Sequence, residues 1–353
     1  MKRSWSIFSV SLTMLALLVA TPKAAKAQVQ NAQVSAQDAA ANKLPSKIKY
    51  VWIILMENHN WTGNNAGAQF GDPDIKGSPL APYTNGWLLH HAAHAERYFN
   101  PPGNHPSLPN YLWLEAGTNF GILQDNLPTD DNLTTHKHLV HLLDKAGISW
   151  KSYAEQDFGN PEYDDCPLGW NEVDPNHVPA VYFADDTNDF NPQSPHCIAH
   201  VVPYSEMATD IADHKVAHYN FISPNVCHDG HEGVSPCASD EPADNTLRGD
   251  QWLKQNVPLI TNSPEFKKAG VLFIVWDEGE DSGAYSDGPI GMFVLSPFAK
   301  GGGQSEYTNY IHYDHNSMLK TEEEIFGLQP LLGGAANPAT KDLRDLFDIS
   351  KLR

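Results

Sequence analysis

Basic residues are scarce in this sequence. Its 353 residues include 23 Lys and Arg against 43 Asp and Glu, which gives a formal net charge of −20 at pH 7. A protein with this charge repels nucleic-acid backbones and anionic lipid surfaces. We therefore expect no nucleic-acid partner. Any phosphate chemistry would need a local positive charge, most simply a metal ion.

Long apolar runs are also scarce. The first, residues 7–20, follows Lys2 and Arg3 and is shorter than the roughly 20 residues that span a bilayer. The small-x-small pattern of residues 25–27 predicts a signal peptide over residues 1–27, with a retained anchor as the alternative. No later run is long and apolar enough to cross a membrane. We therefore expect a secreted or periplasmic protein without a stable membrane anchor.

Cleavage after the signal would remove four of the 23 basic residues and no acids, leaving 19 basic residues against 43 acidic ones and a formal charge of −24. Residues 28–46, rich in Ala, Gln, Asn and Ser, are predicted to form a flexible lead-in. Residues 47–353 are long enough to bury a large core and are predicted to form one catalytic domain. Within it, the proline-rich, loop-rich stretch near residues 155–205 is typical of a subdomain.

Cysteine is equally rare, and no CxxC spacing occurs, which argues against a cysteine-based metal site. An even number of cysteines in an exported chain predicts disulfides. The chain has four, all beyond the signal: Cys166, Cys197, Cys227 and Cys237. Of the three possible connectivities we favour Cys166–Cys197 with Cys227–Cys237, because neighbours in sequence close short loops.

Two apolar runs end abruptly in acids. Residues 50–56 lead into Glu57 and Asn58, and residues 271–276 lead into Asp277 and Glu278. Short apolar runs rich in β-branched residues predict strands buried on both faces, and here they alternate with helical patterns. This order predicts an α/β fold, a three-layer α/β/α sandwich with a mostly parallel central sheet. Ligands bind beyond the carboxyl ends of such strands, where these acids lie.

A serine stands at the start of a predicted helix. Ser107 is a good N-cap, Pro109 is tolerated in a first turn, and Gly117 is a natural helix end. Free amides and the positive end of the helix dipole favour a bound anion beside Ser107. The alternative is that Ser107 only caps the helix.

These residues could together hold a metal that activates a serine. Hard oxygen donors suit Mg²⁺ or Ca²⁺ and also Zn²⁺, so the identity of the divalent ion stays open. The candidate ligands are Glu57, Asn58, Asp277, Glu278 and, as alkoxide, Ser107. The alternative for the acid pair is a solvated turn, since both side chains reach one ion only if the chain bends near Gly279.

Histidines near these strand ends could bind phosphate oxygens or protonate a leaving group. The candidates are His105, His231 and His312, each with a structural role as the alternative. His59 is expected to pack beside the site. No GxSxG motif occurs, which argues against a serine acyl hydrolase.

Several motifs occur in the order of a known family. They are MENHN at residues 56–60, HPSLPNYL at 105–112, FISPN at 221–225 with HDGH at 228–231, VLFIVWDEGE at 271–280 and HYDHNSMLKTEEEIFGL at 312–328. Together they resemble the bacterial phosphoesterase family of secreted acid phosphatases and phospholipase C-like enzymes, in the alkaline phosphatase superfamily. The resemblance covers residues 48–328 and implies an alkaline-phosphatase-like α/β/α core.

The resemblance also implies roles. Ser107 matches the nucleophile that becomes phosphorylated, and Asn58 matches a residue near the phosphate. The metal ligands implied are Glu57, Asn58, Asp277 and Glu278, and the histidines that contact phosphate or act as acid are His231 and His312. The segment at residues 312–317 is longer than the family's His-Tyr-Ser form, so the choice among His312, Asp314 and His315 stays open.

Two departures from the phospholipase branch favour a phosphatase. His-Asn-Trp at residues 59–61 replaces Ser-Phe-Asp, and the nucleophile position holds Ser instead of Thr. We therefore expect a metal-dependent acid phosphatase that hydrolyses small phosphate monoesters through a phosphoserine. The alternatives are a phospholipase C-type phosphodiesterase and a non-catalytic metal-binding relative.

Overall fold

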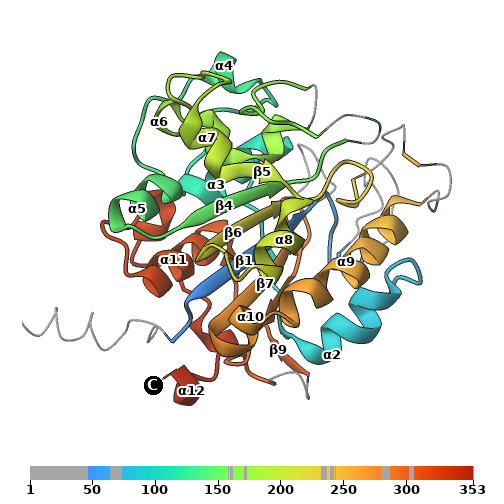
Figure 1. The fold of residues 1–353 in the computed structure, drawn as a ribbon. Helices are drawn as coiled ribbons and strands as arrows, with labels where there is room; N and C mark the ends of the chain where they lie inside the picture. Colours follow the sequence, from blue (N-terminus) through green and yellow to red (C-terminus); the bar gives the residue numbers. More distant parts are fainter. Residues whose placement is uncertain are drawn as a thin grey trace, which may run out of the picture. The chain divides into compact units, whose positions relative to one another are not determined.

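An eight-stranded sheet forms the centre of the computed structural model (Figure 1). The structure describes residues 47–63, 74–157, 159, 162–170, 173–231, 237–238, 242, 244–279, 287–301 and 306–352. The predicted signal peptide and lead-in lie outside these residues. The described residues belong to one compact unit, Leu44–Arg353.

The strand order is β5-β4-β6-β1-β7-β8-β2-β9. The strands are β1 (Tyr50–Met56), β2 (Ala93–Ala95), β4 (Trp150–Ala154), β5 (Val201–Pro203), β6 (Tyr219–Ser223), β7 (Gly270–Trp276), β8 (Met292–Leu295) and β9 (Tyr307–Asn309). Only β8 runs antiparallel to its neighbours, so the sheet is mostly parallel, as predicted. A separate parallel pair joins β3 (Tyr98–Phe99) to β10 (Tyr313–Asp314).

The two apolar runs that end in acids form the two central strands of the sheet, β1 and β7. β1 and β7 pair in parallel from Tyr50 opposite Gly270 to Met56 opposite Trp276. Every residue of β7 is buried, as are all residues of β1 after Tyr50. Strands covered on both faces lose all contact with water, which is why these runs are continuously apolar instead of alternating.

Helices cover the sheet on both faces, which gives the predicted three layers (Figure 1). On one face α3 (Ser107–Ala116), α5 (Leu139–Ala146) and α11 (His315–Phe326) pack together. On the other lie α8 (Glu206–Ala212), α9 (Asn245–Thr261) and α10 (Pro264–Ala269). α9 begins after Asp244, whose side chain caps the helix by accepting the amide of Leu247 at 3.0 Å.

The shorter elements were mostly not predicted. They are the π-helix η1 (Thr84–Leu88), the 3-10 helices η2 (Pro175–His177), η3 (Pro179–Tyr182), η4 (Gly333–Ala336) and η5 (Arg344–Leu346), and the α-helices α2 (Leu89–His91), α4 (Pro128–Asp131), α6 (Ala184–Thr187), α7 (Pro195–His200) and α12 (Ile349–Leu352). Segments of this length carry too little periodicity to be recognised in a sequence.

Both predicted disulfides are present. Cys166 bonds to Cys197 with a Cα–Cα distance of 5.5 Å, and Cys227 bonds to Cys237 with one of 5.7 Å. The first closes the loop-rich stretch near residues 155–205, where η2, η3, α6 and α7 lie. Among the described residues, no helix has the length and hydrophobicity needed to cross a membrane.

Candidate active site

Parallel pairing of β1 and β7 brings Glu57 and Asp277 to the same edge of the sheet. The amide of Asp277 donates to the carbonyl of Met56 at 2.9 Å, and the amide of Asn58 donates to Asp277 Oδ1 at 3.0 Å. The chain bends after Asp277, because Asp277 Oδ1 also accepts the amide of Glu278 at 2.6 Å. Glu57, Asp277 and Glu278 are all buried, so a solvated turn is excluded.

Ser107 faces this cluster from the first turn of α3. Its hydroxyl donates to Glu57 Oε2 at 2.8 Å, and Tyr111, one turn later, donates to the other oxygen of the same carboxylate. The prediction that Ser107 is the N-cap is wrong: Pro106 occupies that position and no side chain caps the helix. Ser107 is the first helical residue, and its hydroxyl bonds to a carboxylate instead of a helix amide.

The anion position expected beside Ser107 is partly filled by the protein itself. The amide of Leu108 donates to Asp125 Oδ1 at 2.9 Å. A helix N-terminus attracts negative charge, and here an acid of the following loop supplies it. An anion bound near Ser107 would therefore have to meet or displace this carboxylate.

Asn58 bridges the carboxylates to a histidine. Its backbone has φ 39°, in the left-handed region that asparagine tolerates better than most residues. The hydrogen-bond network orients its amide so that the nitrogen donates to Glu57 Oε2 at 3.1 Å and to Asp277 Oδ1 at 3.2 Å. The amide oxygen then accepts from His231 Nε2 at 3.0 Å.

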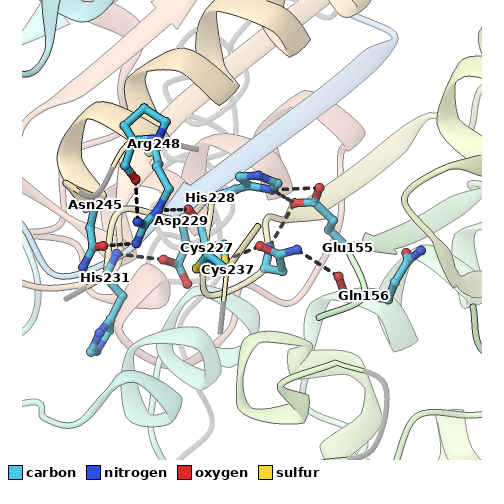
Figure 2. The surroundings of a disulfide bond; sticks show 11 residues. Glu155, Gln156, Cys227, His228, Asp229, His231, Cys237, Asn245 and Arg248 are labelled. Atoms are coloured by element: carbon cyan, nitrogen blue, oxygen red, sulfur yellow. Dashed lines mark hydrogen bonds and ion pairs between the residues drawn. A yellow bond between two sulfur atoms is a disulfide. The ribbon is translucent and has the colours of Figure 1, made fainter. Parts of the chain in front are cut away.

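His231 belongs to a loop that follows β6 and is tied down by the Cys227–Cys237 disulfide (Figure 2). The amide of His231 donates to Asp229 Oδ1 at 2.7 Å, and Arg248 of α9 donates from Nε to the carbonyl of Cys227 at 3.0 Å. The loop therefore reaches the site with its backbone held at two points.

The buried acids repel one another. Burial, and then the charge of Asp229, raise the pKa of Glu57 well above its ordinary value. Burial and the charges of Glu57 and Glu278 do the same to the pKa of Asp277. Asp229 itself is buried, and its pKa is raised by burial and by the neighbouring acids Asp174 and Asp277. A cation among these groups would remove the repulsion.

The residues fit a divalent metal ion. Asp277 Oδ2 and Asp229 Oδ2 are buried and have no hydrogen-bond partner among the described residues. Within the same residues, no Lys or Arg pairs with Glu57, Asp277 or Glu278. Buried carboxylates without a cation are costly, and several carboxylate oxygens beside an amide and a hydroxyl are the donors that Mg²⁺, Ca²⁺ or Zn²⁺ binds.

His105 lies beside the cluster and is partly exposed to solvent. Its Nδ1 is 2.8 Å from Glu278 Oε2, and its Nε2 is 2.9 Å from Asp287 Oδ2. Burial alone would lower the pKa of His105, but the hydrogen bonds to Asp287 and Glu278 raise it to about 10. Burial raises the pKa of Glu278 to about 7, although His105 opposes the rise. Asn110 of α3 also donates to Glu278, at 2.6 Å.

His312 is exposed, and among the described residues no hydrogen bond or ion pair joins it to this cluster. Its ring stacks on that of Phe99, with the centroids 4.8 Å apart. Of the residues left open, Asp314 caps α11 through Ser317, whereas His315 is buried beside the site. His315 Nε2 lies 2.6 Å from the carbonyl of Asp277, so it supports the chain there through the backbone.

Sequence reasoning missed several members of the site. Tyr111 and Asn110 lie within HPSLPNYL, and their spacing of four and three residues from Ser107 could have placed them on its face of the helix. His177 carried no such signal in its proline-rich stretch. Its Nε2 is 3.4 Å from Glu57 Oε1 and its ring stacks on Tyr111. His59 is buried within reach of Thr246, 3.1 Å from its hydroxyl, in line with a packing role.

A family model described as "Phosphoesterase family" matches residues 87–329. The chain belongs to the Phosphoesterase family. Ser107, His231, Asp277 and Glu278 lie inside the match, and Glu57 and Asn58 precede it. By class this phosphoesterase is a hydrolase of phosphoric ester bonds.

Two relatives illustrate the range of the similarity. The phosphoesterase is 26% identical over 298 residues to a phosphatidylinositol-3-phosphatase of Mycobacterium tuberculosis, covering 84% of this chain and 83% of the relative. It is 27% identical over 238 residues to the phosphate-repressible acid phosphatase of Penicillium chrysogenum, covering 65% of this chain and 51% of that one. It thus spans about half the length of that fungal relative.

Among solved structures, a protein of the alkaline phosphatase superfamily from Vibrio parahaemolyticus has a TM-score of 0.50 at 11% identity. The superposition covers 85% of this chain and 73% of that one. At this identity the likeness concerns the fold, and it agrees with the α/β/α architecture predicted from the order of strands and helices.

Proposed function

We propose that this phosphoesterase is a secreted, metal-dependent acid phosphatase that hydrolyses small phosphate monoesters through a phosphoserine at Ser107. The hydrogen bond from the Ser107 hydroxyl to Glu57 carries the proposal, because it directs a buried serine into a cluster of carboxylates at the sheet edge. The family match and the acid phosphatases among the relatives support the reaction class. Two disulfides support export.

Glu57, Asn58 and Asp277 would hold the metal, with Glu278 and Ser107 completing the set. Bound there, a divalent ion lowers the pKa of a coordinated hydroxyl and offsets the charge of a phosphoryl oxygen. Asn58 could then present its amide oxygen to the ion and its nitrogen to the phosphate, the reverse of the orientation that the carboxylates alone favour.

The remaining residues have roles that follow from their positions. The Ser107 oxygen attacks phosphorus and the alcohol of the ester departs, after which water cleaves the phosphoserine and releases phosphate. His231, on the loop after β6, and His105, two residues before Ser107, lie beside the cluster. Both can donate hydrogen bonds to phosphate oxygens or to the leaving group. Tyr111 and His177 hold Glu57 from its far side.

The test compares an aryl phosphate monoester with the corresponding diester on purified protein, with metal analysis of the same sample. We expect faster turnover of the monoester and a covalent phosphate on Ser107 in acid-quenched reactions, located by mass spectrometry. Preference for the diester would favour the phosphodiesterase alternative. Turnover of neither ester by metal-loaded protein would favour a non-catalytic relative.

A further inference from the structure

A second group of histidines and acids lies outside the candidate active site. His138 is the N-cap of α5, His141 follows one turn later, and Asp185 extends from α6. His138 Nε2 lies 3.1 Å from Asp185 Oδ1, and His141 Nδ1 lies 2.7 Å from Asp185 Oδ2. One ligand atom from each of the three residues lies within 4.8 Å of the other two.

We propose that His138, His141 and Asp185 form a second divalent-cation site, of the zinc-binding class, that is structural and separate from the active site. Two imidazoles and one carboxylate are a common ligand set for Zn²⁺. A tetrahedral ion with bonds of about 2.0–2.1 Å would hold its ligand atoms roughly 3.4 Å apart. At present Asp185 Oδ2 lies 3.3 Å from His138 Nε2 and 2.7 Å from His141 Nδ1. Small side-chain movements would therefore admit the ion.

Buried acids lie beside the second ring nitrogen of His138. His138 is fully buried, and its Nδ1 faces Glu115 Oε1 at 3.5 Å and Asp186 Oδ2 at 3.6 Å, while also accepting the amide of His141 at 3.4 Å. Asp186 Oδ2 has no hydrogen-bond partner among the described residues. An ion on Nε2 would leave the proton on Nδ1, which would then donate to one of these carboxylates in place of the long contact with the amide; this is the arrangement that orients metal-bound histidines and strengthens them as ligands.

An ion could enter from solvent and complete its coordination there. The side chains of His141 and Asp185 are 21% and 20% exposed, so the open side of the group faces water. His136, more exposed still, stacks on the His141 ring at 4.7 Å and lies 4.0 Å from Asp185 Oδ2. His136 or a water molecule would supply the fourth ligand.

An ion bound by His138, His141 and Asp185 would link several helices. Glu115 lies in the last turn of α3, the helix that begins with Ser107, and Glu115 also accepts the amide of Val140 at 2.8 Å. An ion on His138 and Asp185 would link α5 and the end of α3 to α6, in the loop-rich stretch that Cys166–Cys197 closes. We therefore expect stabilisation of this region without participation in the reaction.

A proton competes with the metal ion for His138. The acids around His138 raise its pKa to about 9, although burial alone would lower it.

The experiment measures zinc content. The full-length protein is stripped with a chelator, dialysed against Zn²⁺ and analysed for zinc per chain, alongside Asp185→Asn and His141→Gln. His214→Gln is the control, since it removes a histidine that pairs with Glu265 and contributes no atom to this group.

We expect both ligand variants to bind one zinc ion fewer per chain than the wild type and the His214→Gln control. The rise of the wild-type unfolding temperature with Zn²⁺ should shrink in the ligand variants. Equal zinc content in wild type and both ligand variants would overturn the site. Zinc-edge anomalous diffraction from wild-type crystals locates the ions directly, so absence of a peak at His138 would overturn it even if the variants fail to fold.

Discussion

Among single residues, Ser107 has the surroundings that bear most directly on chemistry. Its hydroxyl could have capped α3, the commonest use of a serine before a helix, but it donates to Glu57 instead. A side chain that leaves the helix cap for a buried carboxylate costs the helix some stability. This cost is expected where a residue serves a function.

Replacing Ser107 by Ala should reduce monoester turnover by at least about a thousandfold, because the attacking oxygen is lost. The variant should keep the wild-type circular dichroism spectrum and unfolding midpoint to within a few degrees. Ser152→Ala is the matched control: Ser152 is also buried, its hydroxyl has no partner among the described residues, and it lies on β4. Retained turnover in Ser107→Ala would rule out the phosphoserine.

Tyr111 tests whether the position of Glu57 matters independently of the nucleophile. Tyr111→Phe removes one hydrogen bond to a buried carboxylate while keeping the ring that stacks on His177. Hydrogen bonds to charged groups contribute about 1.5–3 kcal/mol, and we expect a loss of this size in unfolding free energy by urea titration. Monoester turnover should fall with it but remain measurable, and an unchanged free energy would argue against the hydrogen bond.

At the scale of elements, β2 carries an unusual buried histidine. His94 lies between Trp61 and Phe293, with ring centroids 4.5 and 4.6 Å away. Burial, and then the charge of Lys76, lower its pKa to about 3. In the folded protein the imidazole is therefore neutral, whereas in the unfolded chain it takes a proton below about pH 6.5.

This difference makes His94 a source of acid sensitivity in β2. The unfolded state binds the extra proton as pH falls from about 6.5 towards 3, so stability is lost over that range, by up to about 1.4 kcal/mol per pH unit. His94→Phe keeps the ring and removes the titration. Urea unfolding at several pH values should give a wild-type curve that falls towards acid more steeply than the variant's; parallel curves would contradict the assignment.

For the whole molecule, the two disulfides close loops of different size. Cys166–Cys197 spans 31 positions and Cys227–Cys237 spans 10. If each bond acts mainly by restricting the unfolded chain, its stabilisation is about 3.7 kcal/mol for the longer loop and about 2.7 for the shorter. Replacing each pair by Ala in turn should therefore destabilise the protein more at Cys166–Cys197, as measured by chemical denaturation.

The two disulfides should also differ in their effect on turnover. The shorter disulfide holds the loop that presents His231 to the site, so its loss should reduce turnover more than its effect on stability would suggest (Figure 2). The loss of Cys166–Cys197 should reduce turnover of the folded fraction less, since the segment it closes contacts the cluster through His177 beside Glu57 and carries no residue proposed to touch the phosphate. Equal effects of the two replacements on turnover would argue against a positioning role for the β6 loop.

Metal removal is the test of the overall charge balance at the site. A chelator should abolish turnover, and adding back a divalent ion should restore it, because Glu57 and Asp277 repel each other without a cation. The zinc variants described above separate the two sites: Asp185→Asn should keep its turnover after metal is restored. If the protein keeps full turnover when metal analysis finds no bound metal, Glu57, Asn58 and Asp277 are not ligands of a metal that the reaction needs.

The sequence by itself determined the architecture and the chemical class of the site. Short continuous apolar runs rich in β-branched residues predict strands covered on both faces, and polar residues directly after two such runs meet if the strands are neighbours and pair in parallel. Glu57, Asn58 and Asp277 do meet. Neighbouring cysteines closing short loops predicted both disulfides correctly.

Only the tertiary structure decided contacts between segments without local signals. His177 reaches Glu57 from a 3-10 helix too short to show periodicity, and the position of His312 depends on the pairing of two-residue strands. The group of His138, His141 and Asp185 joins segments more than 40 residues apart. Local sequence patterns fix each element, but which side chains share a small volume depends on how those elements pack.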